Sequence, residues 1–446
     1  MPEPLTIADA AGFIRTGALT PSELLEQCLG RIDRYEERVR AWVHIDRAGA
    51  REHAARLTAE VQHNNYRGPL HGIPIGIKDI IDVFDMPTGC GSKRWAQSYA
   101  RRDATCVERL RQAGAVILGK TVTTAYASFD PPVTRNPWNL DRTPGGSSSG
   151  SAAAVACGMC LGALATQTGG SITRPASYCG VYSLKPTHGR VSVDGVLPLA
   201  PSLDHVGVMA NCVRDLAIVF QVIAGHDPRD PTSDTSPVRD CLHAIDGALG
   251  KQHGPVFWFM KSLTDELAEA VMRDALGHLS RSVTTVWMST PTDWRDVLRF
   301  QLVLMSVEAA AYHSARLARD PDDYPPRVRE LIERGLRTPA TEYSAARHAQ
   351  ERSEATMHPQ FGSDDVILTP AAVGPAPPAA TTGDPVFNAP WSFLGTPTVS
   401  VPFAYTADGL PLSAQIAGVA GGDHRVLAAA ACLEREAAFE RRPLPL

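Results

Sequence analysis

The sequence has no basic excess, no long apolar run and no cysteine framework, and each absence excludes a class of protein. Its 446 residues carry 43 basic and 48 acidic side chains, for a net charge of −5 and a pI near 6.3. A nucleic-acid-binding protein would show a basic balance or stripe. The longest apolar candidate, 152–165, is shorter than the ~20 residues that a membrane-spanning helix needs. We therefore expect no nucleic-acid partner and no membrane span.

The cysteines and the first residues of the chain indicate a cytoplasmic protein. The nine cysteines are scattered and odd in number, unlike the framework of a disulfide-rich secreted domain. Cys157 and Cys160 form a C-x-x-C pair inside a run of alanine and glycine, where we expect small buried residues instead of a redox pair. Residues 1–18 lack the basic start and apolar run of a signal peptide. We therefore predict a reduced protein of the cytoplasm.

Lysine is scarce, and one long segment has no charge at all. The chain has six lysines against 37 arginines, and no lysine follows Lys261. From Thr143 to Thr173 there are 31 residues without a single Asp, Glu, Lys or Arg. The overall composition, with 44% hydrophobic and 20% charged residues, is that of a globular protein. The uncharged segment is therefore expected to be buried.

Helical and strand patterns alternate along the chain. Thr20–Glu23 is a capping box that opens an N-terminal helix, and isoleucines alternate from Ile73 in a strand that ends at Lys78. We expect further strands at 115–118, 255–260, 365–369, 396–403 and 412–416, a buried helix at 151–164, a turn at 166–174 and a last helix from about residue 424. This alternation predicts an α/β fold. A single domain over 1–446 is the simplest organisation.

Two short motifs match known sites but lack the context that these sites need. Residues 114–121 match the G-x-x-x-x-G-K-[ST] pattern of a phosphate-binding loop, yet the four middle residues are strand-forming and no apolar strand precedes Gly114. Residues 146–150 match the G-x-S-x-G nucleophile elbow, yet a Pro/Asn/Asp loop precedes them where that motif needs a strand. A nucleotide-binding module that uses Gly114–Thr121 is the non-enzyme alternative, and a nucleotide titration tests it.

Three other segments carry reactive residue types in a fixed order. They are GIPIGIKD at 72–79, GGSSSGS at 145–151 and TGGSITRPA at 168–176. Each alone has an ordinary explanation, as a strand-end lysine, a helix cap and a tight turn. Together, with Ser147 and Ser171 24 residues apart, they resemble the amidase signature family. The stretches GAVILGKT, NPWNLDRTPGG, YCGVYSLKPTHGRVS and NAPWSFLGTPTVSVPF resemble this family too, so that the similarity covers nearly the whole chain.

The resemblance implies an amidohydrolase with a serine–serine–lysine triad. Ser171 matches the nucleophile, Ser147 the bridging serine with an unusual cis peptide, and Lys78 the base. The matching oxyanion hole is formed by the amides of Thr168, Gly169, Gly170 and Ser171. By family analogy Ser148 orients its loop. The resemblance also implies a large mixed sheet covered by helices on both faces, and neither a metal nor an organic cofactor.

Such a triad needs a lysine that is neutral near physiological pH. The ordinary lysine pKa of ~10.4 must fall by roughly 3 units, which is about 4 kcal/mol. Burial without nearby charge lowers the pKa of a lysine, and the uncharged stretch around both serines supplies such walls. Asp79 follows Lys78 but points the other way if the strand continues. Arginine could not replace Lys78, because a guanidinium does not deprotonate.

Two departures from the commonest family pattern argue against the glutamine-hydrolysing component of a tRNA-dependent amidotransferase, which is the enzyme alternative. Gln167 stands where many members have Asp, and Arg174 follows Ser171 by three places instead of two. That component also needs partner subunits. Arg174 is our candidate for binding a carboxylate or polar carbonyl of the substrate, since a guanidinium can bind an anion with two hydrogen bonds. The alternative, that Arg174 pairs with structural groups, is equally open.

The expected substrate is a small molecule with an amide or urea-like C–N bond, including amides that bear a carboxylate. The candidates for contact with it are Arg174, Tyr126, Gln167 and Ser148, and weaker candidates are Phe129, Gln301, Met305, Tyr312, His313, Asn388 and Trp391. A helical region at about 292–361 is expected to shape substrate access. The sequence leaves a homodimer open.

Overall fold

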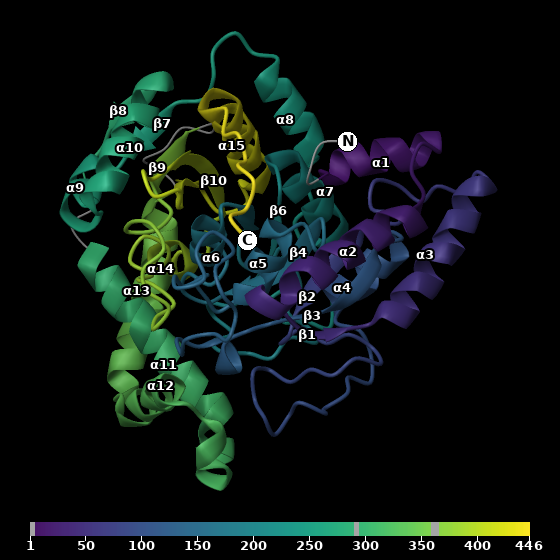
Figure 1. Cartoon of the computed structure of the whole chain (residues 1–446). Helices are drawn as coiled ribbons and strands as arrows, with labels where there is room; N and C mark the ends of the chain where they lie inside the picture. Colours follow the sequence, from purple (N-terminus) through teal and green to yellow (C-terminus); the bar gives the residue numbers. More distant parts are fainter. Residues whose placement is uncertain (1–4, 290–293, 358–364) are drawn as a thin grey trace.

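The computed structural model describes residues 5–289, 294–357 and 365–446 (Figure 1). The strands are β1 (Trp42–Ile45), β2 (Pro74–Lys78), β3 (Val116–Thr121), β4 (Gly162–Gln167), β5 (Tyr182–Lys185), β6 (His205–Ala210), β7 (Phe257–Phe259), β8 (Thr285–Trp287), β9 (Val366–Pro370), β10 (Thr398–Tyr405) and β11 (Pro411–Ala417). The α-helices are α1 (Ile7–Thr16), α2 (Pro21–Val39), α3 (Arg47–Gln62), α4 (Thr105–Gln112), α5 (Ser149–Ala156), α6 (Thr173–Cys179), α7 (Val213–Ile223), α8 (Cys241–Leu249), α9 (Lys261–Leu267), α10 (Ala270–Ser282), α11 (Trp294–Arg319), α12 (Pro326–Arg337), α13 (Ala340–Met357), α14 (Ala389–Phe393) and α15 (Asp423–Ala437). Two short 3₁₀ helices, η1 (Ala125–Ala127) and η2 (Pro321–Asp323), complete the described elements.

The strands form one mixed sheet of 11 strands, in the order β1-β3-β2-β4-β6-β5-β10-β11-β9-β7-β8. Parallel pairs such as β2–β4 and antiparallel pairs such as β4–β6 occur in the same sheet. Every residue of β2, β3, β4, β6 and β11 is buried. Because successive side chains of a strand point to opposite faces, strands without an exposed residue must be covered on both faces. The predicted fold, a large mixed sheet between helices, is confirmed.

The N-terminal helix begins where the sequence predicts it. The hydroxyl of Thr20 accepts a hydrogen bond from the backbone N–H of Glu23 (3.1 Å), and the Glu23 carboxylate accepts one from the backbone N–H of Thr20 (2.8 Å). Pro21 occupies the first helical position, where its missing N–H is not needed. In Figure 1, α1, α2 and α3 lie at one side of the molecule, and α11, α12 and α13 lie at the other.

The helix predicted at 151–164 is wrong in its second half. α5 ends at Ala156, Gly158 has a φ of +67°, and the chain then enters β4 at Gly162. β4 is a central strand between β2 and β6, and both of its faces are buried. A strand buried on both faces shows no alternation, so a run of small apolar residues does not distinguish it from a buried helix.

The other predicted strands are present, while several more escaped prediction. The strands predicted at 73–78, 115–118, 255–260, 365–369, 396–403 and 412–416 correspond to β2, β3, β7, β9, β10 and β11. β1, β5, β6 and β8, as well as β4, have no counterpart among the predicted strands. The predicted turn at 166–174 contains the end of β4 and the start of α6. The region predicted to be helical at 292–361 contains α11, α12 and α13, and its ends at 292–293 and 358–361 lie outside the described residues.

The segment that matches a phosphate-binding loop is a strand. Residues 116–121 form β3, which pairs with β1 and β2. Lys120 is fully buried, and its Nζ lies 3.1 Å from the carboxylate of Asp79. A strand cannot turn its N–H groups around a phosphate, so the geometry contradicts the nucleotide-binding alternative. In the described part of the chain, no helix has both the length and the apolar character needed to cross a membrane.

Candidate active site

The three motif segments meet at the carboxyl ends of two parallel strands. Lys78 is the last residue of β2, and β2 pairs with β4 in parallel, with Ile77 opposite Leu164. The turn that carries Ser171 follows the end of β4. Crevices outside the carboxyl ends of strands are the usual location of sites in α/β sheets. Segments far apart in the sequence therefore meet at one edge of the sheet.

Lys78 Nζ lies in a fully buried pocket of hydroxyl and carbonyl oxygens. It lies 2.7 Å from Ser147 Oγ and 2.7 Å from Thr166 Oγ1, and the carbonyl oxygen of Thr166 is 3.4 Å away. Neither Lys78 nor Ser147 is exposed to solvent, whereas 8% of Ser171 is exposed. Among the described residues, no hydrogen bond joins Ser171 Oγ to Ser147. The structure thus brings Lys78 and Ser147 into contact and places Ser171 on the neighbouring turn.

The surroundings of Lys78 disfavour its charged form. Burial lowers the pKa of Lys78 well below its ordinary value, and the charge of Asp204 raises it by a smaller amount. Asp79 points away and pairs with Lys120, as the alternation of the strand predicts. All residues of the uncharged segment Thr143–Thr173 are buried. The uncharged segment is therefore buried as predicted, and Asp204, which lies outside it, is the charged group that acts on Lys78.

The loop that carries Ser147 is fixed from three directions. The peptide bond between Gly146 and Ser147 is cis, as the family resemblance implies. The backbone N–H of Thr124 donates to the carbonyl oxygen of Ser147 (3.1 Å), and Arg174 Nη2 donates to the carbonyl oxygen of Gly146 (2.9 Å). Ser148 Oγ donates to the carbonyl oxygen of Thr166 at 3.1 Å and accepts from its N–H at 3.3 Å. Ser148 therefore joins the loop to β4, in agreement with its expected orienting role.

The turn that carries Ser171 is held by three polar side chains from other parts of the fold. Gln167 Oε1 accepts from the backbone N–H groups of Ile172 (2.9 Å) and Thr173 (3.1 Å). Gln301 Nε2, on α11, donates to the carbonyl oxygen of Thr168 (3.2 Å). Ser392 Oγ, on α14, donates to the carbonyl oxygen of Gly169 (3.1 Å). The contacts of Gln301 and Ser392 thus use the carbonyl oxygens of Thr168 and Gly169 as acceptors.

Asp204 is a residue of this site to which the sequence pattern assigned no role. It precedes β6 and accepts hydrogen bonds from Thr168 Oγ1 (2.5 Å) and from the backbone N–H groups of Leu199 (2.8 Å) and Ala200 (3.0 Å). Burial raises the pKa of the Asp204 carboxyl to about 7. No local sequence pattern relates Asp204 to Thr168, which is 36 residues away.

Three of the four residues predicted to contact substrate are buried and form hydrogen bonds within the protein. Gln167 and Ser148 are fully buried and make the contacts described above. Arg174 is 1% exposed, and its Nε and Nη2 donate to Thr382 and Gly146, while Nη1 is buried without a partner. These side chains support the loop of Ser147 and the turn of Ser171. Their substrate contacts stay predictions, and for Arg174 the observed bonds favour the structural role.

Tyr126, the fourth candidate, belongs to an aromatic cluster with His313 of α11 and Tyr324, which lies between η2 and α12. Its ring stacks on Tyr324 with centroids 4.5 Å apart and meets His313 edge to face at 5.1 Å. Its hydroxyl donates to Asp323. Of the weaker candidates, Gln301 contacts the turn directly, and Met305, His313, Asn388 and Trp391 are buried.

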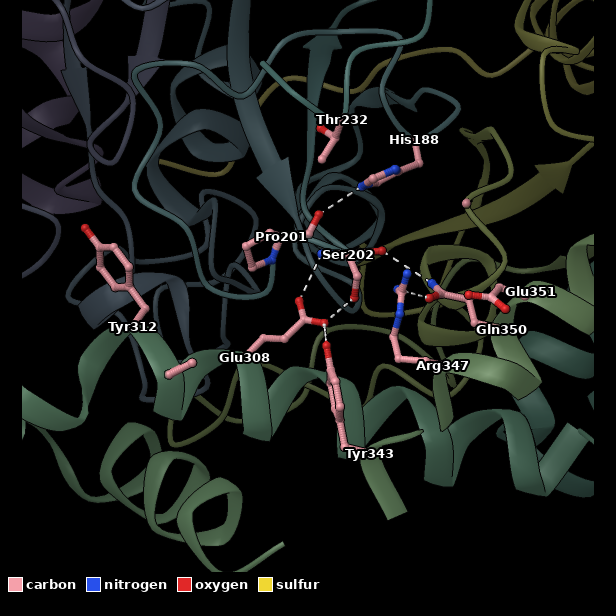
Figure 2. A pocket seen from close by; sticks show the side chains of 12 residues that line it. His188, Pro201, Ser202, Thr232, Glu308, Tyr312, Tyr343, Arg347, Gln350 and Glu351 are labelled. Carbon is pink, nitrogen blue, oxygen red and sulfur yellow. Dashed lines mark hydrogen bonds between the residues drawn. The ribbon is translucent and has the colours of Figure 1, made fainter. Parts of the chain in front are cut away.

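A pocket of about 680 Å³ lies next to this site, between α11, α13 and the loop that precedes β6. In Figure 2, the carboxylate of Glu308 points at Ser202, which contributes both its backbone N–H (2.9 Å) and its hydroxyl (2.7 Å). Tyr343 donates to the same carboxylate at 3.1 Å. Ser171 is not among the residues that line this pocket. It borders the loop of Asp204 instead of the turn of Ser171.

Comparison with known proteins gives one consistent family. A profile of the Amidase family matches residues 23–427. The putative amidase AmiD of Mycobacterium tuberculosis is 34% identical over 459 residues, which cover 99% of this chain and 96% of that protein. A glutamyl-tRNA(Gln) amidotransferase component from a Roseiflexus species is 36% identical over 463 residues, which cover 95% of this chain and 94% of that protein.

The fold agrees with this result. The solved structure of the native peptide amidase from Stenotrophomonas maltophilia has a TM-score of 0.85 and 28% identity to this chain, and the match covers 99% of this chain and 98% of that one. The profile match, the relatives and the fold together confirm the resemblance seen in the sequence. The chain therefore belongs to the amidase signature family of amide-hydrolysing enzymes.

Proposed function

We propose that the chain hydrolyses the amide C–N bond of a small molecule, with Ser171 as the nucleophile and Ser147 and Lys78 as proton relay and base. The observation that carries this proposal is the 2.7 Å contact between the buried Lys78 Nζ and Ser147 Oγ. A serine hydroxyl is a poor nucleophile and needs an adjacent base. A lysine whose pKa is lowered by burial can be that base.

The oxygens around Lys78 suit a neutral amine. A neutral amine has two N–H groups and one lone pair. Thr166 supplies two acceptors, its hydroxyl at 2.7 Å and its carbonyl at 3.4 Å. The lone pair is then free to accept the hydroxyl proton of Ser147. Lys78 need not touch Ser171, because Ser147 relays the proton between them.

The proposed cycle balances without a cofactor. Ser171 Oγ attacks the amide carbonyl carbon while its proton passes through Ser147 to Lys78. The backbone amides of residues 168–171 stabilise the negative charge on the carbonyl oxygen, and losing one such donor typically costs ~3–4 kcal/mol in the barrier. Lys78 returns the proton to the leaving nitrogen, and ammonia or an amine departs. Water, with its proton taken by the same route, then releases the carboxylic acid and restores Ser171.

The buried part of this route is already aligned, whereas the contact between the two serines forms with substrate. Catalytic hydrogen bonds are often long in free enzymes and shorten in the complex. Ser171 is the most exposed of the three groups, as a nucleophile that meets substrate must be. An amide carbonyl seated against the turn would direct Ser171 Oγ toward Ser147.

The substrate class is the less specific part of the proposal. We include amides that bear a carboxylate and urea-like compounds, for which Arg174 is the candidate partner through its free Nη1. The similarity to a glutamyl-tRNA(Gln) amidotransferase component is the reason to retain the alternative of a glutamine-hydrolysing component. Gln167 in place of Asp and the spacing of Arg174 favour the free-standing amidohydrolase. We also propose a single domain, a reducing cytoplasm, supported by nine free cysteines, and no obligatory partner.

The nucleophile is tested with a fluorophosphonate probe on the purified chain. The probe is expected to label the wild type and to miss Ser171→Ala, since only an activated serine attacks it. Ser149→Ala is the matched control, because Ser149, the first residue of α5, is a buried serine two residues after Ser147 whose hydroxyl donates to Thr134. Labelling of Ser171→Ala at the wild-type rate would refute the assignment. A panel of simple amides, ureas and half-amides of dicarboxylic acids, scored for released ammonia, then identifies the substrate class.

A further inference from the structure

We propose that Asp204 is a positioning residue of this active site, which anchors the first residue of the oxyanion turn and sets the charge that Lys78 experiences. The inference rests on the proposed function, since it assigns a role relative to Lys78 and the turn of Ser171. Nothing in the motifs marks this residue. The assignment comes from the contacts of one carboxylate at the junction of two loops.

Asp204 anchors the side chain of Thr168. One oxygen of Asp204 accepts from Thr168 Oγ1 at 2.5 Å, and the other accepts from Leu199 N–H at 2.8 Å and Ala200 N–H at 3.0 Å. A carboxylate that accepts three hydrogen bonds has little freedom to rotate. Thr168 therefore has a fixed side chain at the point where β4 ends and the turn begins.

The loop that carries Asp204 is itself held on a second side. Glu308 on α11 accepts both the N–H and the hydroxyl of Ser202, two residues before Asp204 (Figure 2). Gln350 on α13 donates to the carbonyl oxygen of Ser202 at 3.3 Å. The position of Thr168 is thus fixed through Asp204 to a loop that two helices support.

Lys78 and Asp204 both contact threonine side chains at the carboxyl end of β4. Lys78 contacts the side chain of Thr166, and Asp204 contacts the side chain of Thr168, two residues further. Thr166 lies in β4 and Thr168 is the first residue after it, so their Cα atoms are at most ~7 Å apart. The carboxylate of Asp204 thus lies near the amine of Lys78, and its negative charge raises the pKa of Lys78.

The other charged groups around this pair act in known directions. Glu308 on α11 raises the pKa of Asp204, and the hydrogen bonds from Thr168, Leu199 and Ala200 lower it. His205 follows Asp204 on β6, and burial holds its pKa well below the ordinary value, so it is neutral. Asp79 is paired with Lys120. Asp204 is thus the group that opposes the effect of burial on Lys78.

The test is the pH dependence of kcat/KM in Asp204→Asn. Asparagine can keep every contact, because its oxygen can face the two N–H groups and its amide can donate to the Thr168 hydroxyl. The variant loses only the charge, so the pKa of Lys78 falls. Since Lys78 must be neutral to act, kcat/KM rises with pH through this pKa, and the acid limb of the variant is expected to lie at lower pH than that of the wild type. The gain is confined to pH values at which the wild-type Asp204 is ionised, and the two profiles converge at lower pH, where this buried carboxyl is protonated.

A second variant separates anchoring from charge. Thr168→Val keeps the backbone amide and the Asp204 charge but loses the hydroxyl link. We expect kcat at the pH optimum to fall by about 10- to 100-fold, because a small displacement of catalytic groups has effects of this size. Asp215→Asn is the matched control. Asp215 is also a buried carboxylate that accepts two backbone N–H groups, at α1, and its loss should lower Tm without moving the pH profile.

The outcomes distinguish this inference from the proposed function. An Asp204→Asn variant whose acid limb coincides with that of the wild type overturns the role of the charge, and a Thr168→Val variant with wild-type kcat overturns the anchoring. Rates are expressed per active site, counted with the fluorophosphonate probe, so that partial unfolding does not mimic an effect. Turnover that survives in Ser171→Ala would instead refute the proposed function itself.

Discussion

At the scale of single residues, the chemistry depends on a lysine that the fold keeps without charge. Lys78 is one of six lysines in the chain, and its pKa is lowered by burial. The two other buried lysines differ from it in their contacts. Lys120 pairs with Asp79, and Lys185 Nζ donates to the backbone carbonyls of Pro186 and Thr396. Only Lys78 among these three contacts a serine hydroxyl.

The first prediction concerns this lysine. Lys78→Ala and Lys78→Arg are both expected to lower kcat/KM by about 10²- to 10⁴-fold, because alanine removes the base and arginine cannot deprotonate. Lys185→Met is the control. Burial lowers the pKa of Lys185 to about 7, so it resembles Lys78 in environment but not in contacts. This control is expected to lower Tm and to retain turnover per labelled site. Unimpaired turnover in Lys78→Ala would contradict the mechanism.

The second prediction separates the two roles of Arg174. Its bonds to Gly146 and Thr382 hold the loop of Ser147. If this structural role dominates, Arg174→Ala lowers kcat/KM for neutral and acidic amides by the same factor, because the loop is displaced for both. Steady-state kinetics on a matched pair, such as a diamide and the corresponding half-amide, measures the two factors. A selective loss for the acidic substrate would show instead that Arg174 binds its carboxylate.

At the scale of elements, the turn between β4 and α6 is packed so closely that one of its glycines has no room for a side chain. A Cβ at Gly170 would lie 2.6 Å from Arg174 Nη1 and 2.7 Å from Asn388 Oδ1. At Gly169 the nearest atom would be Gln301 Nε2 at 3.6 Å, which is an ordinary contact. Gly169 therefore has room for a Cβ atom and Gly170 does not, although both belong to the same motif.

The third prediction follows from this difference. Gly170→Ala forces the buried side chains of Arg174 and Asn388 to move and is expected to cost ~1–3 kcal/mol of stability, as overpacking usually does, with a loss in kcat of about 10²-fold. Gly169→Ala is expected to keep a Tm close to that of the wild type. Thermal unfolding and active-site titration measure both effects. Equal Tm values for the two variants would contradict the packing argument.

The success of sequence-based prediction also varied by element. The capped helix α2 and the alternating strand β2 have local signals and were predicted correctly. β4 has no such signal, because both of its faces are buried and its residues are small. The contact between Lys78 and Ser147 could be expected only through the family resemblance, and Asp204 could not be found at all. A hydrogen bond between residues 36 apart, such as that of Thr168 and Asp204, leaves no local pattern.

At the scale of the whole molecule, one sheet carries the site and helices from distant parts of the chain support it. The strands β1 to β11 all belong to a single sheet, and one domain over 1–446 stays a prediction. α11 supplies Gln301 to the turn of Ser171 and Glu308 to the loop of Asp204. The helical region predicted to shape substrate access therefore also supports the catalytic loops.

The fourth prediction concerns the chain as an independent enzyme. The purified chain alone is expected to release ammonia from a small amide, without a second protein, tRNA or ATP, because every proposed catalytic group comes from this chain. An ammonia assay on the isolated protein measures this, with Ser171→Ala as the blank. Turnover that needed glutamine together with the other components of a tRNA-dependent amidotransferase would favour the alternative function.

The sequence by itself determined the family, the order of the motifs and the identity of the candidate groups, because these are properties of residue types and their spacing. It also placed an uncharged segment around both serines. Only the tertiary structure decided how these groups act on one another. The parallel pairing of β2 and β4 brings Lys78 to Thr166, 88 residues away, and the loop before β6 brings the carboxylate of Asp204 to Thr168, directly after β4. A pKa depends on burial and on nearby charge, and both are set by contacts between segments distant in sequence.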